Sequence, residues 1–147
     1  MIAYDPATNP LNNNEWAFPL LEIIHIAGFT LSIGTIALVD LRLLGLGFRR
    51  LASAELARQL APWTLIGLIV MLISGPLIFS SDPNMYLHNI SFKFKMVALA
   101  VAILYHYTIH NWTAYRQPAP AVGKLVGGVS VLLWVSVVAG GLFIAFF

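Results

Sequence analysis

Residues Leu125 to Phe147 read LVGGVSVLLWVSVVAGGLFIAFF, a stretch without a charged side chain. Because an α-helix rises about 1.5 Å per residue, about 20 apolar residues cross the hydrocarbon core of a bilayer. Three earlier stretches are also largely apolar between polar segments. We therefore predict an all-α integral membrane protein, a single transmembrane domain over residues 1–147 with spans at about 16–39, 63–79, 94–112 and 125–147.

The composition agrees with a chain that is surrounded by lipid. Of the 147 residues, 59% are hydrophobic and only 10% are charged. The eight Lys and Arg residues are spread between the apolar segments and form no continuous stripe, so we expect no nucleic-acid partner. The chain has no cysteine, which excludes disulfides, thiolate metal ligands and covalently attached c-type haem.

The basic residues also predict the orientation of the spans. Segments that carry Lys and Arg stay in the cytoplasm, and six of these residues lie in the segments after the first and third spans: Arg42, Arg49, Arg50, Arg58, Arg116 and Lys124. We therefore expect an up-down bundle in a bacterial inner membrane, with both termini outside. Residues 49–60 are amphipathic, which favours either a short helix on the inner surface or an extension of the first span. We expect Pro62 to open the second span and residues 80–89 to form a loop.

Ionisable side chains within the spans are the most informative feature for function, because such groups are costly in lipid and usually mark a site. At 100° per residue, His25 shares one face of the first span with Glu22, Gly28, Ser32 and Asp40. The same arithmetic aligns the third span's Lys95, Ala98, Ala102, His106 and His110. Asp40 is expected to meet a cation, for which Arg58 and Lys124 are candidates.

These residues suit a haem held between two helices. Such a haem needs an imidazole on each side of its iron, small neighbours that leave room for the macrocycle, and cations for its propionates. We predict haem b with His25 and His106 as axial ligands, Gly28 and Ala102 as the small neighbours, and Lys93 or Lys95 at the propionates. His110 lies deeper in the membrane and would hold a second haem, cap the helix end, or hydrogen-bond to a neighbour.

Other interpretations of the same residues remain open. Glu22 and His25 are spaced as metal ligands on one helix face and, with His106, would suit a single ion such as copper, bound or transported. Alternatively, the histidines donate hydrogen bonds between helices in a cofactor-free structural subunit, and Gly123 and Gly127 fit close helix packing. For the haem protein we expect an electron-transfer subunit rather than a self-contained enzyme. Its partners would be lipid, a quinone or periplasmic redox partner, and either copies of itself or a larger membrane complex.

Three short runs carry a resemblance to a known family: His25-Ile26-Ala27-Gly28, then Asp40-Leu41-Arg42-Leu43-Leu44-Gly45, and then Phe92-Lys93-Phe94-Lys95. Together they resemble an uncharacterised family of bacterial four-helix inner-membrane proteins, over nearly the whole chain from Trp16 onward. The resemblance implies the fold and the membrane but no reaction. The architecture is also similar to that of small b-type cytochromes and of copper-resistance membrane domains, which is a likeness of fold alone.

Overall fold

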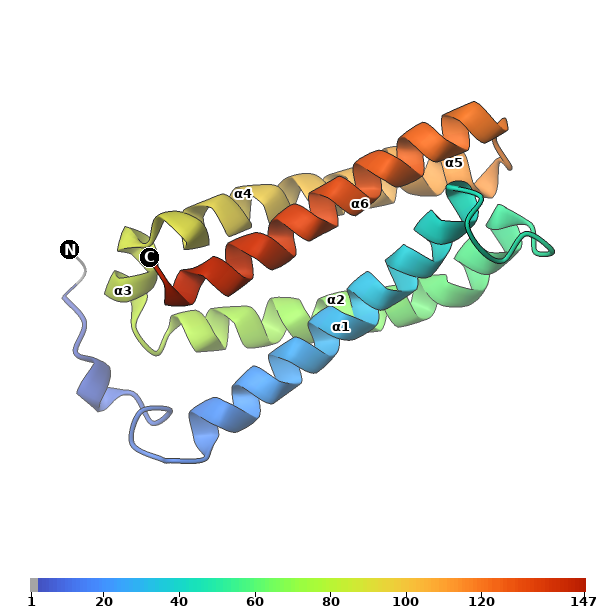
Figure 1. The fold of residues 1–147 in the computed structure, drawn as a ribbon. Coiled ribbons are helices and arrows are strands. Elements are labelled where there is room, and N and C mark those ends of the chain that lie inside the picture. Colours follow the sequence, from blue (N-terminus) through green and yellow to red (C-terminus); the bar gives the residue numbers. More distant parts are fainter. Residues whose placement is uncertain (1–2) are drawn as a thin grey trace.

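The structure is a computed structural model that describes residues 3–147. Within this part the chain is all-helical, and four segments are long and apolar enough to cross a membrane, which confirms the predicted multi-pass four-helix bundle. They comprise α1 (Ala17–Leu43), α2 (Ser53–Phe79), the segment Ile90–Tyr115 and the segment Pro120–Ala145. Consecutive segments run antiparallel, and the N-terminal tail and Phe147 lie at the same end (Figure 1).

The last two segments are each built from more than one element. Ile90–Tyr115 consists of α4 (Ile90–Tyr105), a π-helical turn η2 (His106–His110) and α5 (Asn111–Tyr115). Pro120–Ala145 consists of α6 (Pro120–Leu142) and a final 3₁₀ turn η3 (Phe143–Ala145). The π turn is the irregular part of the bundle interior, and it contains two of the histidines.

The second helix begins at Ser53, much earlier than the predicted start near Trp63. Residues 49–60 therefore form neither a separate surface helix nor an extension of the first span, and Pro62 lies inside α2. The early turns are stabilised by tertiary contacts, because Leu56 and Ala57 are buried in a hydrophobic cluster with residues of α1, α5 and α6. In addition, Ser53 Oγ donates to the carbonyl of Ala114 at 2.7 Å.

The end of the bundle that holds both termini is closed by polar contacts. The expected loop contains a short helix, α3 (Pro83–His88), whose first turn is capped by the Asp82 side chain. Asn89 caps α4 and donates from Nδ2 to the carbonyl of Ile144 at 2.8 Å. The tail, which contains a 3₁₀ turn η1 (Pro6–Thr8), is joined to the end of α2, since Asn9 and Asn12 donate to carbonyls of Ser80 and Ser81 at 2.8 and 2.9 Å.

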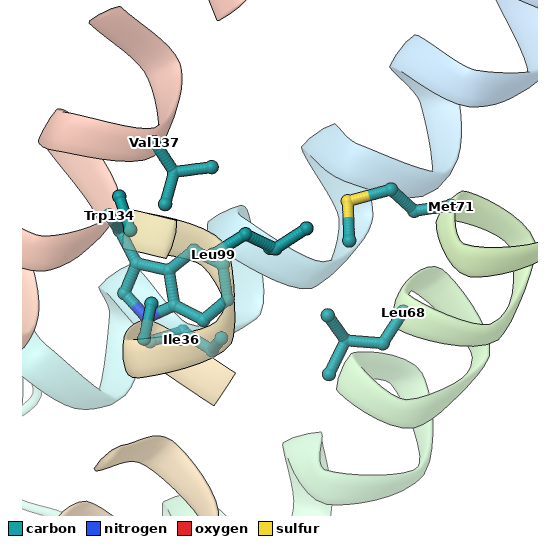
Figure 2. Close-up of a cluster of buried hydrophobic side chains, with 8 residues drawn as sticks. Ile36, Leu68, Met71, Leu99, Trp134 and Val137 are labelled. Atoms are coloured by element: carbon teal, nitrogen blue, oxygen red, sulfur yellow. The ribbon is translucent and has the colours of Figure 1, made fainter. Parts of the chain in front are cut away.

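The interior combines close backbone contacts with one central hydrophobic cluster. Helices α1 and α2 touch at Gly28 and Gly67, where a Cβ on Gly67 would lie 2.6 Å from the Gly28 carbonyl oxygen. Between the helix pairs lies the cluster of Figure 2, to which every long helix contributes: Ile36, Leu68, Met71, Ala98, Leu99, Ala102, Trp134 and Val137. Many large apolar side chains remain exposed on all four helices, as expected for surfaces that contact lipid.

Candidate functional site

His25 extends from α1 toward α2, where its Nδ1 lies 2.8 Å from Ser74 Oγ. The Ser74 hydroxyl itself donates to the carbonyl of Val70 at 2.7 Å, so its oxygen accepts from the ring. In this arrangement Nδ1 carries the proton, and the lone pair of Nε2 is available to a further partner. A hydrogen bond from the second ring nitrogen is the usual way in which proteins orient a metal-binding imidazole. This is the tautomer in which the second ring nitrogen of His25 can act as a metal ligand.

Lys95 brings a positive charge into the same half of the bundle. Its ammonium lies 5.9 Å from the centroid of the Phe29 ring on α1. The side chain passes over two glycines of α6: a Cβ on Gly140 would lie 3.0 Å from Lys95 Cβ, and one on Gly141 would lie 3.5 Å from Nζ. In the described residues no carboxylate is within ion-pair distance of this ammonium. Lys93, by contrast, is exposed.

The other two intramembrane histidines lie together in the π turn. His106 and His110 are buried, and their ring centroids are 5.0 Å apart. The Nδ1 atom of each ring is buried without a hydrogen-bond partner. Turns of this kind occur frequently at functional sites. Nothing in the sequence predicts the π turn. It forms when backbone N–H groups bond the carbonyl five residues earlier instead of four, and that choice depends on the packing of the whole bundle.

His110 is held by a buried polar trio that joins three helical segments. Its Nε2 donates to Asp40 Oδ1 at 2.6 Å, and Ser130 Oγ donates to Asp40 Oδ2 at 2.8 Å. The expectation that Asp40 meets Arg58 or Lys124 is therefore wrong. The guanidinium of Arg58 lies over the ring of Tyr115 instead, at 5.9 Å from its centroid. Asp40 is buried, and its partners come from the interior stripes of the neighbouring helices.

The structure does not bring His25 and His106 to one position along the bundle. Fifteen residues separate His25 from Asp40, and four separate His106 from His110, which is bonded to Asp40. At 1.5 Å per residue the two rings therefore lie at levels about 16 Å apart. Two nitrogens on one iron are only about 4 Å apart, since each metal–nitrogen bond is about 2 Å long. In α1 and α4 the side chains of the central hydrophobic cluster occupy the intervening positions.

The remaining predicted site residues have packing or surface roles in the structure. Gly28 faces α2, where a Cβ would lie 2.8 Å from Val70 Cγ1. Ala102 is fully buried in the central hydrophobic cluster. Glu22 is exposed and lines a shallow depression with Asp82 and Tyr86. Among residues 3–147 no three His, Asp or Glu side chains are grouped closely enough to hold a metal ion, so Glu22, His25 and His106 do not form a common set.

A bundle of four membrane-crossing helices with polar groups at two interior levels defines the class as a multi-pass integral membrane protein. The chain belongs to a family of unknown function (DUF6644), whose model matches residues 19–147. This agrees with the resemblance to an uncharacterised four-helix family. No curated protein and no solved structure matches the chain significantly.

Proposed function

We propose that the protein binds haem b in the half of the bundle that contains both termini, with His25 Nε2 as an axial ligand. The observation that carries this proposal is the chain of hydrogen bonds from His25 Nδ1 to Ser74 Oγ and on to the Val70 carbonyl. It holds the imidazole in one orientation and leaves the second nitrogen available for iron. A noncovalent b-type haem is the form consistent with the absence of cysteine.

Lys95 supports the same proposal. An ammonium inside a membrane segment is costly unless an anion compensates it, and this one has no carboxylate partner among the described residues. A haem propionate would supply that anion. Gly75 adds room beside the ligand, because a Cβ there would lie 3.5 Å from His25 Cε1. The ring of Phe29, whose centroid lies 5.9 Å from the Lys95 ammonium, adds apolar surface beside it.

In this proposal the protein is an electron-transfer subunit of a bacterial inner membrane. Haem iron supplies a one-electron carrier when it is bound. By the distribution of Lys and Arg, His25 lies in the outer half of the membrane, which favours exchange between a quinone or membrane enzyme and a partner outside. His106 as a second axial ligand stays a prediction that requires the helices to shift, since the two imidazoles are at different levels.

The test is the absorption spectrum of protein purified in mild detergent from haem-replete cells. We expect a Soret band that shifts on reduction with dithionite and a pyridine haemochrome of the b type. His25→Ala should remove the haem, whereas His106→Ala should retain it. The matched control is His88→Ala, because His88 is exposed on α3, where its Nδ1 bonds the carbonyl of Asn84 in the same helix.

Three outcomes would decide against parts of this proposal. A colourless wild-type preparation would overturn it and favour the cofactor-free structural subunit. A full spectrum in His25→Ala would exclude His25 as the ligand. Loss of haem in both His25→Ala and His106→Ala would support the pairing of His25 with His106 that the sequence predicts. It would also mean that the helices shift relative to one another when haem binds.

A second candidate is a metal-binding protein, and the unpartnered Nδ1 atoms of His106 and His110 favour it. Imidazole nitrogens suit copper and zinc. Stoichiometric copper in a colourless preparation, lost in His106→Ala but not in His25→Ala, would support this candidate over haem.

A further inference from the structure

A cavity of about 550 Å³ opens at the end of the bundle opposite to His25. It lies between the end of α1, the segment that joins α1 to α2, and the beginning of α6. Three of its lining residues are cationic, namely Arg42, Arg49 and Lys124, and none is acidic. In the described part of the chain none of the three forms an ion pair. The cavity is therefore a concentration of positive charge without a counterion from the protein.

The two arginines are held in a way that leaves their terminal groups free. Arg42 Nε donates to the Leu51 carbonyl at 2.6 Å, and Arg49 Nε donates to the Gly45 carbonyl at 2.7 Å. These bonds fix the stems of both side chains across the loop. The Nη groups remain available for a ligand, and a guanidinium presents such groups as a planar fork that matches phosphate oxygens.

The start of α6 also favours an anion. This helix begins at Pro120 without a side-chain cap, so its first N–H groups add positive potential at the wall. This feature supports the three cations but would not define a site without them.

We propose that this cavity binds the phosphate group of an anionic ligand, either the headgroup of an acidic phospholipid in the adjacent leaflet or a soluble phosphate. Basic pockets between transmembrane helices on the cytoplasmic side are known to suit anionic headgroups. The site uses none of the residues assigned to haem, so a negative result for one proposal does not affect the other.

The test is the thermal unfolding of the full chain in nanodiscs. One set of discs contains phosphatidylcholine alone, a second contains phosphatidylcholine with phosphatidylglycerol, and a third contains phosphatidylcholine with added inorganic phosphate. A rise in Tm only with phosphatidylglycerol identifies the lipid headgroup as the ligand. A saturable rise with inorganic phosphate identifies a soluble phosphate. No rise in either would overturn the proposal.

The variants compare cations in the cavity with cations beside it. The first combines Arg42→Gln, Arg49→Gln and Lys124→Gln, and should lose the rise in Tm. The control combines Arg50→Gln, Arg58→Gln and Arg116→Gln, which removes the same charge from the same end of the bundle but from residues that do not line the cavity. Equal losses in both would mean non-specific attraction to the surface and would overturn the proposal.

Because Arg42 and Arg49 also hold the loop, a single change at an exposed position provides a check that does not depend on the loop. Lys124→Glu should reduce the rise in Tm by at least half, whereas Lys93→Glu at the opposite end should leave it unchanged. An undiminished rise in Lys124→Glu would contradict the proposed site.

Discussion

Two intramembrane histidines at different levels of the bundle have partners of different chemistry. His25 bonds a serine hydroxyl, and His110 bonds a carboxylate that also accepts from Ser130. A hydroxyl orients the ring and leaves it neutral, with a lone pair available for a metal. A buried carboxylate instead ties the ring into a network that links three helical segments. The residue type alone therefore does not reveal the role of either histidine, whereas its partner does.

The largest expected effect on stability follows a change in the buried polar trio of Asp40, His110 and Ser130. Asp40→Ala leaves His110 and Ser130 buried without their shared acceptor, and removing one member of such a pair costs about 3–5 kcal/mol. The free energy of unfolding, measured by denaturant titration in detergent micelles, should fall by that amount. The double variant Asp40→Ala/His110→Ala should lose less than the sum of the two single variants, because the two residues interact directly. Additive losses would contradict the pairing.

A smaller effect is expected at the contact between α1 and α2, which aligns His25 with Ser74. In Gly67→Ala the new Cβ would lie 2.6 Å from backbone atoms of Gly28 and Ser32, so the two helices must separate. Overpacking of this kind costs about 1–3 kcal/mol, which the same titration would measure. Gly34→Ala is the matched control, since nothing lies within 4 Å of its Cβ. Equal effects at both positions would exclude the close contact.

The smallest expected change in stability follows Ser74→Ala, which removes the bond to His25 across the two helices, worth about 1 kcal/mol, together with the Ser74 bond within its own helix. If His25 binds haem, the same variant should weaken haem affinity about 10- to 100-fold, because it removes the group that orients the ligand. Haem retention against a competing apoprotein would measure this. Ser136→Ala is the control, as its hydroxyl bonds the carbonyl of Leu132 in its own helix. Unchanged affinity in Ser74→Ala would leave the serine with a packing role.

The fold was predictable because apolar stretches such as Leu125 to Phe147 can satisfy their backbone groups in lipid only as helices. The helix boundaries were less predictable, since the first turns of α2 contain polar residues and are stabilised by contacts with distant segments. One missed element did have a signal in the sequence: Asp82 followed by Pro83 is typical of a helix start, and α3 begins there.

The sequence predicted the helix face on which each site residue lies, but not its position along the bundle axis. Helical periodicity places Asp40 and His110 on interior stripes, and the structure confirms that both are buried. The relative shift of two helices along the bundle axis depends on how their side chains interlock, which a single sequence does not reveal. That shift decides that His110 meets Asp40 and that His25 lies at a different level from His106.

The buried trio also bears on how the chain is assembled. Helices α1 and α2 can associate as a hairpin as soon as both are inserted, because Gly28 and Gly67 meet within it. Asp40 then still faces lipid, where an ionisable group is costly. Its acceptor oxygens are satisfied only after the π turn and α6 have been synthesised and docked. Truncated or half-inserted chains would therefore expose an acidic group within the bilayer, a feature by which membrane quality-control proteases could distinguish them from finished molecules.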